Sequence, residues 1–255
     1  MIPYHKEIIM DHSPYYRHRP ESNIAVLLIH GILSTPRHFD WLIPSIPDDV
    51  EVYNILLKGH GGTVADFSKA TMQQWQAQVS EAVKSMERPG RKIILIGHSL
   101  GALLALQTAQ NRRSICGLML LNPPLKPWVR PSMVWRSLRF AFGRIRTDDP
   151  GDISCYQDLG ITLEPQLWKY LGWIPNFISL LILAGKCRNI PAKLSIPCFA
   201  YLGRKDELVH IGSKKWLQDC LNITLRFFPH GTHFGYTEAE KLLIDTDFKD
   251  LLRQK

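Results

Sequence analysis

The chain has 255 residues, of which 45% are hydrophobic, and this is enough for one large α/β domain with an insertion. Its net charge is +8, but no motif supports nucleic-acid binding. No uninterrupted apolar run reaches the ~18 residues of a membrane span, and the first residues lack the apolar segment of a signal peptide. The five cysteines are scattered and form neither a disulfide framework nor a metal-ligand pattern. We therefore expect a cytoplasmic protein with reduced thiols, no metal and no cofactor.

The first strong strand signal is the apolar run Ile24–Ile29, followed by the loop His30–Thr35. His30 is expected to be a hydrogen-bonded structural residue rather than a base. Further on, Thr71 and Gln74 have capping-box spacing, and the apolar residues after them recur at helical spacing. This pattern predicts a helix that begins after Thr71.

The pentapeptide Gly97-His98-Ser99-Leu100-Gly101 matches G-x-S-x-G. An apolar run at 92–96 precedes it and predicts a buried strand, whereas the apolar run at 102–106 predicts a buried helix. A bare match of this kind arises by chance, but strand, turn, serine and helix in this order are typical of a nucleophile elbow. The pattern indicates that Ser99 is a nucleophile on a strained turn, which needs a base and an orienting carboxylate later in the chain.

The next predicted strand, Cys116–Leu121, ends at the prolines of residues 122–124. Between residues 125 and 192 the alternation of strands and helices fails, and two apolar stretches at 133–142 and 173–183 appear. We interpret 125–192 as a helical cap over the active-site edge, with 1–124 and 193–255 as the core. The alternative is ordinary helix packing on the main domain. Residues expected to line an apolar acyl pocket are Trp135, Phe142, Phe177 and Leu181.

A strand predicted at 196–203 ends in glycine, and the charged loop 204–209 follows it. A carboxylate just past the end of this strand lies on the same sheet edge as the serine. Asp206 is the preferred acid, and Glu207 is the alternative. If the charged loop is only a solvated turn, neither carboxylate has a catalytic role.

The last predicted strand, at 224–228, leads into a loop with two histidines, His230 and His233. His233 is the preferred base because it lies deeper in the loop, directly before a helix predicted to begin near Thr237. Strands that alternate with helices along the chain predict a mostly parallel sheet covered by helices on both faces.

These stretches resemble the α/β-hydrolase superfamily, and within it the small bacterial carboxylesterases and monoacylglycerol lipases. The resemblance rests on four stretches, at 28–32, 57–62, 96–101 and 203–206 with 231–233. It implies the α/β-hydrolase fold with an inserted helical cap. It also implies Ser99 as nucleophile, Asp206 as acid and His233 as base, with the backbone amides of Ile32 and Leu100 forming the oxyanion hole. The residues after the histidine, Phe234 and Gly235, depart from the usual pattern and leave the shape of the substrate open.

The sequence thus predicts a cofactor-independent serine hydrolase that cleaves carboxylic esters or monoacylglycerols through an acyl-enzyme. Amide, thioester or carbon–carbon cleavage on the same scaffold is the first alternative, because fold does not fix function. A non-catalytic ligand receptor is a further alternative, which the intact serine, acid and histidine disfavour.

The cap also carries a basic cluster, made up of Arg130, Arg136, Arg139, Arg144 and Arg146. Such a cluster favours weak contact with an anionic membrane surface or attraction of anionic substrates. A simple solvated face is the preferred interpretation.

Overall fold

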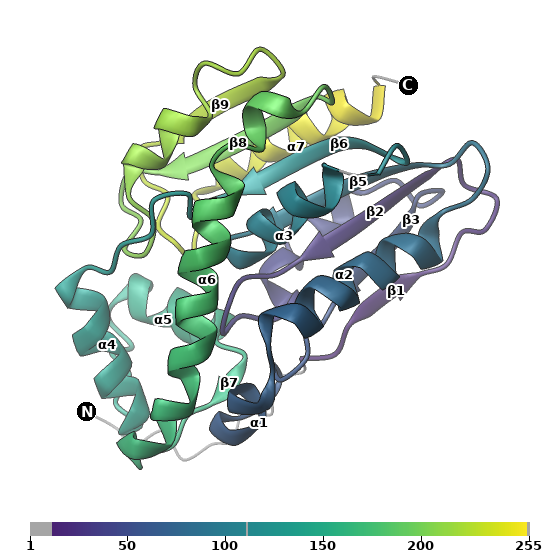
Figure 1. The fold of residues 1–255 in the computed structure, drawn as a ribbon. Coiled ribbons are helices and arrows are strands. Elements are labelled where there is room, and N and C mark those ends of the chain that lie inside the picture. The colour runs from purple at the N-terminus through teal and green to yellow at the C-terminus, as the bar shows by residue number, and fades with distance from the viewer. Residues whose placement is uncertain (1–11, 111, 254–255) are drawn as a thin grey trace.

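The computed structural model describes residues 12–110 and 112–253. A seven-stranded sheet forms its centre, in the order β1-β3-β2-β5-β6-β8-β9 (Figure 1). Strand β1 runs antiparallel to β3, and the other neighbouring pairs are parallel, as the alternating pattern predicts. The strands are β1 (Tyr15–Arg17), β2 (Ile24–Ile29), β3 (Glu51–Ile55), β5 (Lys92–His98), β6 (Ile115–Leu121), β8 (Cys198–Gly203) and β9 (Ile223–Phe228).

Helices cover both faces of this sheet (Figure 1). Within β2, Ala25 and Leu27 face one hydrophobic core and Val26 and Leu28 face the other, because successive side chains of a strand point to opposite faces. Helices α1 (Val64–Lys69), α2 (Met72–Met86) and α3 (Leu100–Ala109) pack in the first core, and α7 (Glu238–Arg253) packs in the second.

The predicted start of α2 is confirmed. The Thr71 side chain accepts a hydrogen bond from the Gln74 amide, and the Gln74 side chain accepts one from the Thr71 amide. Two of the unpaired amides at the start of the helix are thereby satisfied. Trp75, Val79 and Val83 then form the buried face of the helix.

The segment expected to be a cap lies beyond the carboxyl ends of the strands, beside the sheet (Figure 1). It contains α4 (Pro131–Ala141), α5 (Pro150–Asp158), β7 (Ile161–Thr162) and α6 (Ile174–Cys187). The segment also includes the 3-10 helices η3 (Leu167–Trp173) and η4 (Pro191–Lys193). The 3-10 helices of the core are η1 (Pro36–Phe39), η2 (Ile43–Ser45) and η5 (Ile211–Trp216). Strand β7 pairs with β4 (Gly62–Thr63) of the core in a separate two-stranded sheet. The segment is therefore fastened to the core at its middle as well as at its ends.

One helical stretch of the cap, Leu167–Lys193, is long and apolar enough to cross a membrane by length and composition. A search of the sequence for consecutive apolar residues does not find this stretch, because polar residues are scattered along it. Its buried positions Leu183, Ala184 and Cys187 belong to the core that contains α3, whereas Leu181 and Ile182 are exposed. The stretch packs on the core along one face, as an amphipathic helix does.

Candidate active site

Ser99 lies between β5 and α3 in a strained backbone conformation, with φ 51° and ψ −115°. Its amide donates to the carbonyl of Leu121, 2.9 Å away. A Cβ on Gly101 would lie 1.9 Å from the carbonyl oxygen of Ile29, and a Cβ on Gly97 would lie 2.3 Å from that of Gly101. Both glycines are therefore required by close packing, and together they produce the sharp turn that the sequence predicts.

His233 and Asp206 form a buried hydrogen-bonded pair. The Nδ1 atom of His233 lies 2.9 and 3.0 Å from the two carboxylate oxygens of Asp206. The carboxylate itself accepts the amides of Leu208 and Val209, each at 2.7 Å, just after β8 ends. The other candidate base, His230, is exposed at the surface. The geometry therefore favours His233 over His230, and Asp206 over a solvated turn.

The pKa of His233 lies above its usual value. Burial of the ring lowers this pKa, but the charge of Asp206, its hydrogen bond and the charge of Glu207 together raise it by more. A negative charge beside the ring stabilises the imidazolium that a general base becomes during catalysis.

Ser99 is close to this pair but is not bonded to it. Within the described residues, the Ser99 hydroxyl makes no hydrogen bond to His233. The neighbour of Ser99, His98, packs its ring 4.8 Å from the ring of His233 and hydrogen-bonds through Nε2 to the His233 carbonyl. Serine–histidine hydrogen bonds are often long before substrate binds.

Two backbone amides close to Ser99 are available to a ligand. Leu100 is the first residue of α3, so its amide has no intrahelical partner. The amide of Ile32 has no acceptor among residues 12–110 and 112–253. The loop that carries Ile32 lies against the elbow, because a Cβ on Gly31 would be 3.1 Å from the Cβ of Ser99. These are the two amides expected to form an oxyanion hole.

Two histidines hold this loop in place, and the sequence analysis gave a structural role only to the first. The His30 ring accepts the amide of Leu57 at 3.0 Å, and the His60 ring accepts the amide of Leu33 at 3.1 Å. Each ring therefore carries its proton on the other nitrogen and stays neutral. Burial lowers the pKa of His60 to about 4 and places that of His30 well below its usual value. His60 thus fixes the residue after Ile32.

Glu207, the rival acid in the sequence, contacts the His233 backbone rather than its ring. One carboxylate oxygen accepts the His233 amide at 3.2 Å, and the other accepts Arg136 of α4 at 3.2 Å. Arg136 and Arg139 both pair with the buried carboxylate of Asp152 on α5. Part of the basic cluster is therefore an internal ion-pair network that joins the cap to the histidine loop, and is not a solvated face.

Two polar residues anchor the same loop from the core, and both were overlooked as site residues. Glu240 accepts the amides of His230 and Gly231, each at 3.0 Å, and also caps the start of α7. The side chain of Asn122 joins the carbonyl of Thr232 to the amide of Gly203. The sequence placed Glu240 only near the start of the helix predicted to begin at about Thr237, and nothing in the local sequence links Asn122 to a loop 110 residues away.

The four expected pocket residues lie on the outer side of the cap. Trp135 is 68% exposed, and the exposed fractions of Leu181, Phe142 and Phe177 are 57%, 55% and 37%. Their side chains are exposed in this structure, and the buried side of α6 packs in the hydrophobic core that contains α3. Binding of an acyl chain by these residues stays a prediction.

A match to the alpha/beta hydrolase family covers residues 26–246, and the chain belongs to this family. Over 111 residues it is 30% identical to a thermostable monoacylglycerol lipase of Bacillus sp. (strain H-257), in an alignment that spans 43% of this chain and 44% of that enzyme. Its fold is similar to a structure reported for LipS and LipT, two metagenome-derived lipolytic enzymes, with a TM-score of 0.73, 18% identity, and 96% and 98% of the two chains covered. It is also similar to N-formylmaleamic acid deformylase of Pseudomonas putida S16, with a TM-score of 0.61, 15% identity, and 91% and 94% covered.

Proposed function

We propose that the protein is a serine hydrolase that cleaves carboxylic esters, including monoacylglycerols. The observation that carries this proposal is the buried Asp206–His233 pair at the same sheet edge as the strained Ser99. The similarity to a monoacylglycerol lipase and to lipolytic enzymes supports the substrate class.

In the proposed mechanism, Ser99 attacks the ester carbonyl carbon while His233 takes the hydroxyl proton. Asp206 keeps the proton of neutral His233 on Nδ1, so that Nε2 is the basic nitrogen. The amides of Ile32 and Leu100 stabilise the oxyanion, and loss of one such donor costs about 3–4 kcal/mol in comparable sites. His233 then gives its proton to the leaving alcohol. Water attacks the acyl-enzyme with His233 again as base, which releases the acid and restores Ser99.

Cleavage of an amide, a thioester or a carbon–carbon bond is the second candidate. The similarity to a deformylase supports it, because the same scaffold there serves a different bond. The serine, histidine and acid fit all of these reactions equally well. A non-catalytic receptor is less well supported, since it has no need for a buried acid–histidine pair beside a strained serine.

The test compares Ser99→Ala with the wild-type protein on p-nitrophenyl esters from acetate to palmitate. We expect the substitution to lower turnover by several orders of magnitude, on the order of 10⁶-fold in a comparable triad, and to abolish fluorophosphonate labelling. Circular dichroism checks that the fold is unchanged. If the cap binds acyl chains, kcat/KM rises from acetate and then levels off, because each buried methylene contributes ~0.8 kcal/mol. Near-normal turnover by Ser99→Ala would contradict the mechanism.

A further inference from the structure

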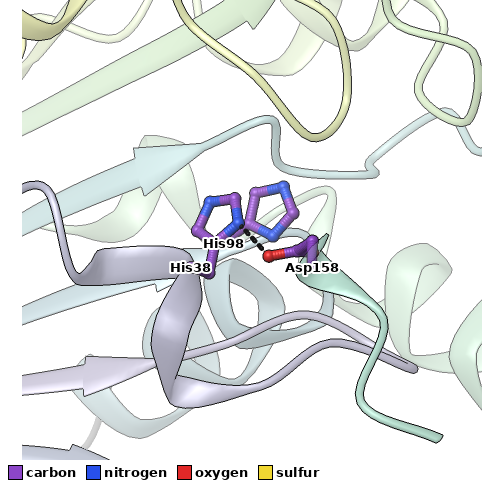
Figure 2. Close-up of side chains that lie close together, drawn as sticks. All are labelled: His38, His98 and Asp158. Carbon is purple, nitrogen blue, oxygen red and sulfur yellow. Dashed lines mark hydrogen bonds and ion pairs between the residues drawn. The ribbon is translucent and has the colours of Figure 1, made fainter. Parts of the chain in front are cut away.

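Three buried side chains meet directly behind the nucleophile elbow, and the proposed reaction uses none of them. His38 comes from η1, His98 from the end of β5 and Asp158 from the end of α5 (Figure 2). All three are at least nine-tenths buried. One possible ligand atom from each lies within 4.8 Å of the others. The sequence indicates no metal site, because 60 residues separate each of these positions from the next.

The hydrogen bonds around this cluster show which of its atoms have a partner. Nε2 of His98 lies 2.9 Å from the carbonyl of His233, so it is a donor, and Nδ1 of His98 is a bare acceptor. Nδ1 of His38 lies 2.8 Å from one oxygen of Asp158, and Nε2 of His38 has no partner among the described residues.

Three buried polar atoms of the cluster lack a hydrogen-bond partner among the described residues: Nε2 of His38, Nδ1 of His98 and the second oxygen of Asp158. Buried polar atoms without a partner are rare in native proteins and call for an explanation such as an ion.

A cleft borders the cluster on one side. It has a volume of about 310 Å³ and is lined by His38 and Asp158 together with Trp41, Phe234 and Tyr236. A Cβ on Gly31 would lie 2.9 Å from Nδ1 of His98, so a larger residue at this position would crowd that nitrogen.

We propose that His38, His98 and Asp158 bind one divalent transition-metal ion of the zinc type. Two imidazoles and one carboxylate match the ligands of zinc and its neighbours, whereas calcium and magnesium prefer oxygen ligands. Tetrahedral zinc with bonds of 2.0–2.1 Å holds its ligand atoms roughly 3.3 Å apart. The stacked rings of His38 and His98, whose centroids are 3.8 Å apart, must therefore rotate, and Asp158 must move inward. Because Asp158 belongs to the cap and the histidines to the core, the ion ties the cap to the nucleophile elbow.

The direct test is calorimetric titration of Zn²⁺ into tag-free, chelator-treated protein, with Mg²⁺ and Ca²⁺ as comparison ions. We expect one Zn²⁺ per chain, a rise in melting temperature with Zn²⁺, and no saturable binding of the other two ions. The same titration of Ser99→Ala is expected to give the same affinity, so the result does not depend on whether the protein hydrolyses esters.

Variants locate the ion. His38→Gln and Asp158→Asn are each expected to weaken Zn²⁺ binding at least tenfold, whereas His230→Gln, at an exposed histidine, leaves it unchanged. The absorption spectrum of the wild-type protein with Co²⁺ in place of Zn²⁺ is a second test, which does not require any variant to fold. We expect d–d bands and no thiolate charge-transfer band. The proposal would be overturned if the protein showed no saturable Zn²⁺ binding, or if His38→Gln and Asp158→Asn bound Zn²⁺ as tightly as the wild-type protein. A thiolate band in the Co²⁺ spectrum would also overturn it.

Discussion

Asp206 and Glu207 are consecutive carboxylates with different roles. Asp206 bonds to the ring of His233 and Glu207 to its backbone amide, so one sets the charge of the base and the other its position. The charge of Glu207 is in turn balanced by Arg136 of the cap. The cap therefore contributes to the position of the base through an ion pair, without touching the imidazole itself.

The first residue-scale prediction concerns pH. In the proposed mechanism His233 acts as a base only when neutral, and its pKa lies above the ordinary 6.5. We therefore expect kcat/KM to fall as pH decreases, with a midpoint above 6.5. Asp206→Asn removes the largest influence that raises this pKa while burial still lowers it, so its residual activity is expected to decline at a lower pH. It is also expected to lower kcat by about 10⁴-fold. Profiles of kcat/KM between pH 5 and 9 check both statements, and an unchanged midpoint in Asp206→Asn would contradict them.

The second residue-scale prediction concerns Glu207. Its replacement by Ala removes a hydrogen bond from the His233 amide to a charged acceptor, a contact worth about 1.5–3 kcal/mol. We expect kcat to fall roughly 10–100-fold with little change in KM, and the pKa of the base to fall because a negative charge is lost. Arg136→Met is expected to lower kcat by a smaller factor, because Glu207 keeps its hydrogen bond to the His233 amide. Arg144→Met on the exposed cap surface serves as the matched control, and an equal effect of this control would exclude a specific role for the network.

At the scale of elements, Gly160 of the cap is packed closely against two loops of the core. Gly160 donates its amide to the carbonyl of Leu33 and accepts the amide of Gly61, which joins the proposed oxyanion loop to the loop of His60. A Cβ on Gly160 would lie 2.3 Å from the carbonyl oxygen of Ser34. Backbone cannot move aside as a flexible side chain does, so a larger residue must displace one of the loops.

Gly160→Ala is therefore expected to lower the free energy of unfolding by about 1–3 kcal/mol, and to lower kcat/KM because the Ile32 amide moves. Gly185→Ala is the matched control, since nothing lies within 4 Å of its Cβ position in α6. That substitution is expected to be neutral or stabilising by up to about 1 kcal/mol. Urea unfolding and kcat/KM of both variants check the prediction, which fails if the two glycines respond alike.

At the scale of the whole molecule, apolar exposure is concentrated on the cap. Of the 19 exposed large hydrophobic side chains among the described residues, 14 lie between Trp128 and Ile182. The chain has a net charge of +8, and Arg144 and Arg146 of the cap are exposed. An apolar face next to basic residues favours the surface of an anionic bilayer.

We therefore expect a small fraction of the protein to sediment together with phosphatidylserine-containing vesicles. This fraction is expected to fall when salt is added or the anionic lipid is omitted. Leu181→Glu on the exposed side of α6 is expected to weaken it. Leu242→Glu, at an equally exposed position on α7, is the matched control. Equal binding by wild-type protein and Leu181→Glu would assign the apolar face another role.

The elements and the elbow could be predicted from the sequence alone, because both depend on neighbours within a few residues. Strands β2, β5 and β6 are nearly continuous apolar runs, and the capping box of α2 is local, so each was predicted within a residue or two of its observed bounds. The order of serine, acid and histidine along the chain followed from the family pattern. The residues that surround this triad could not be predicted in the same way, because they meet only in the folded chain. Asn122 with Thr232, Arg136 with Glu207, and His38 with His98 and Asp158 are contacts between residues 60 to 120 positions apart. Such contacts arise because parallel strands bring their carboxyl ends to one edge of the sheet, and no local pattern in the sequence marks which side chains meet there.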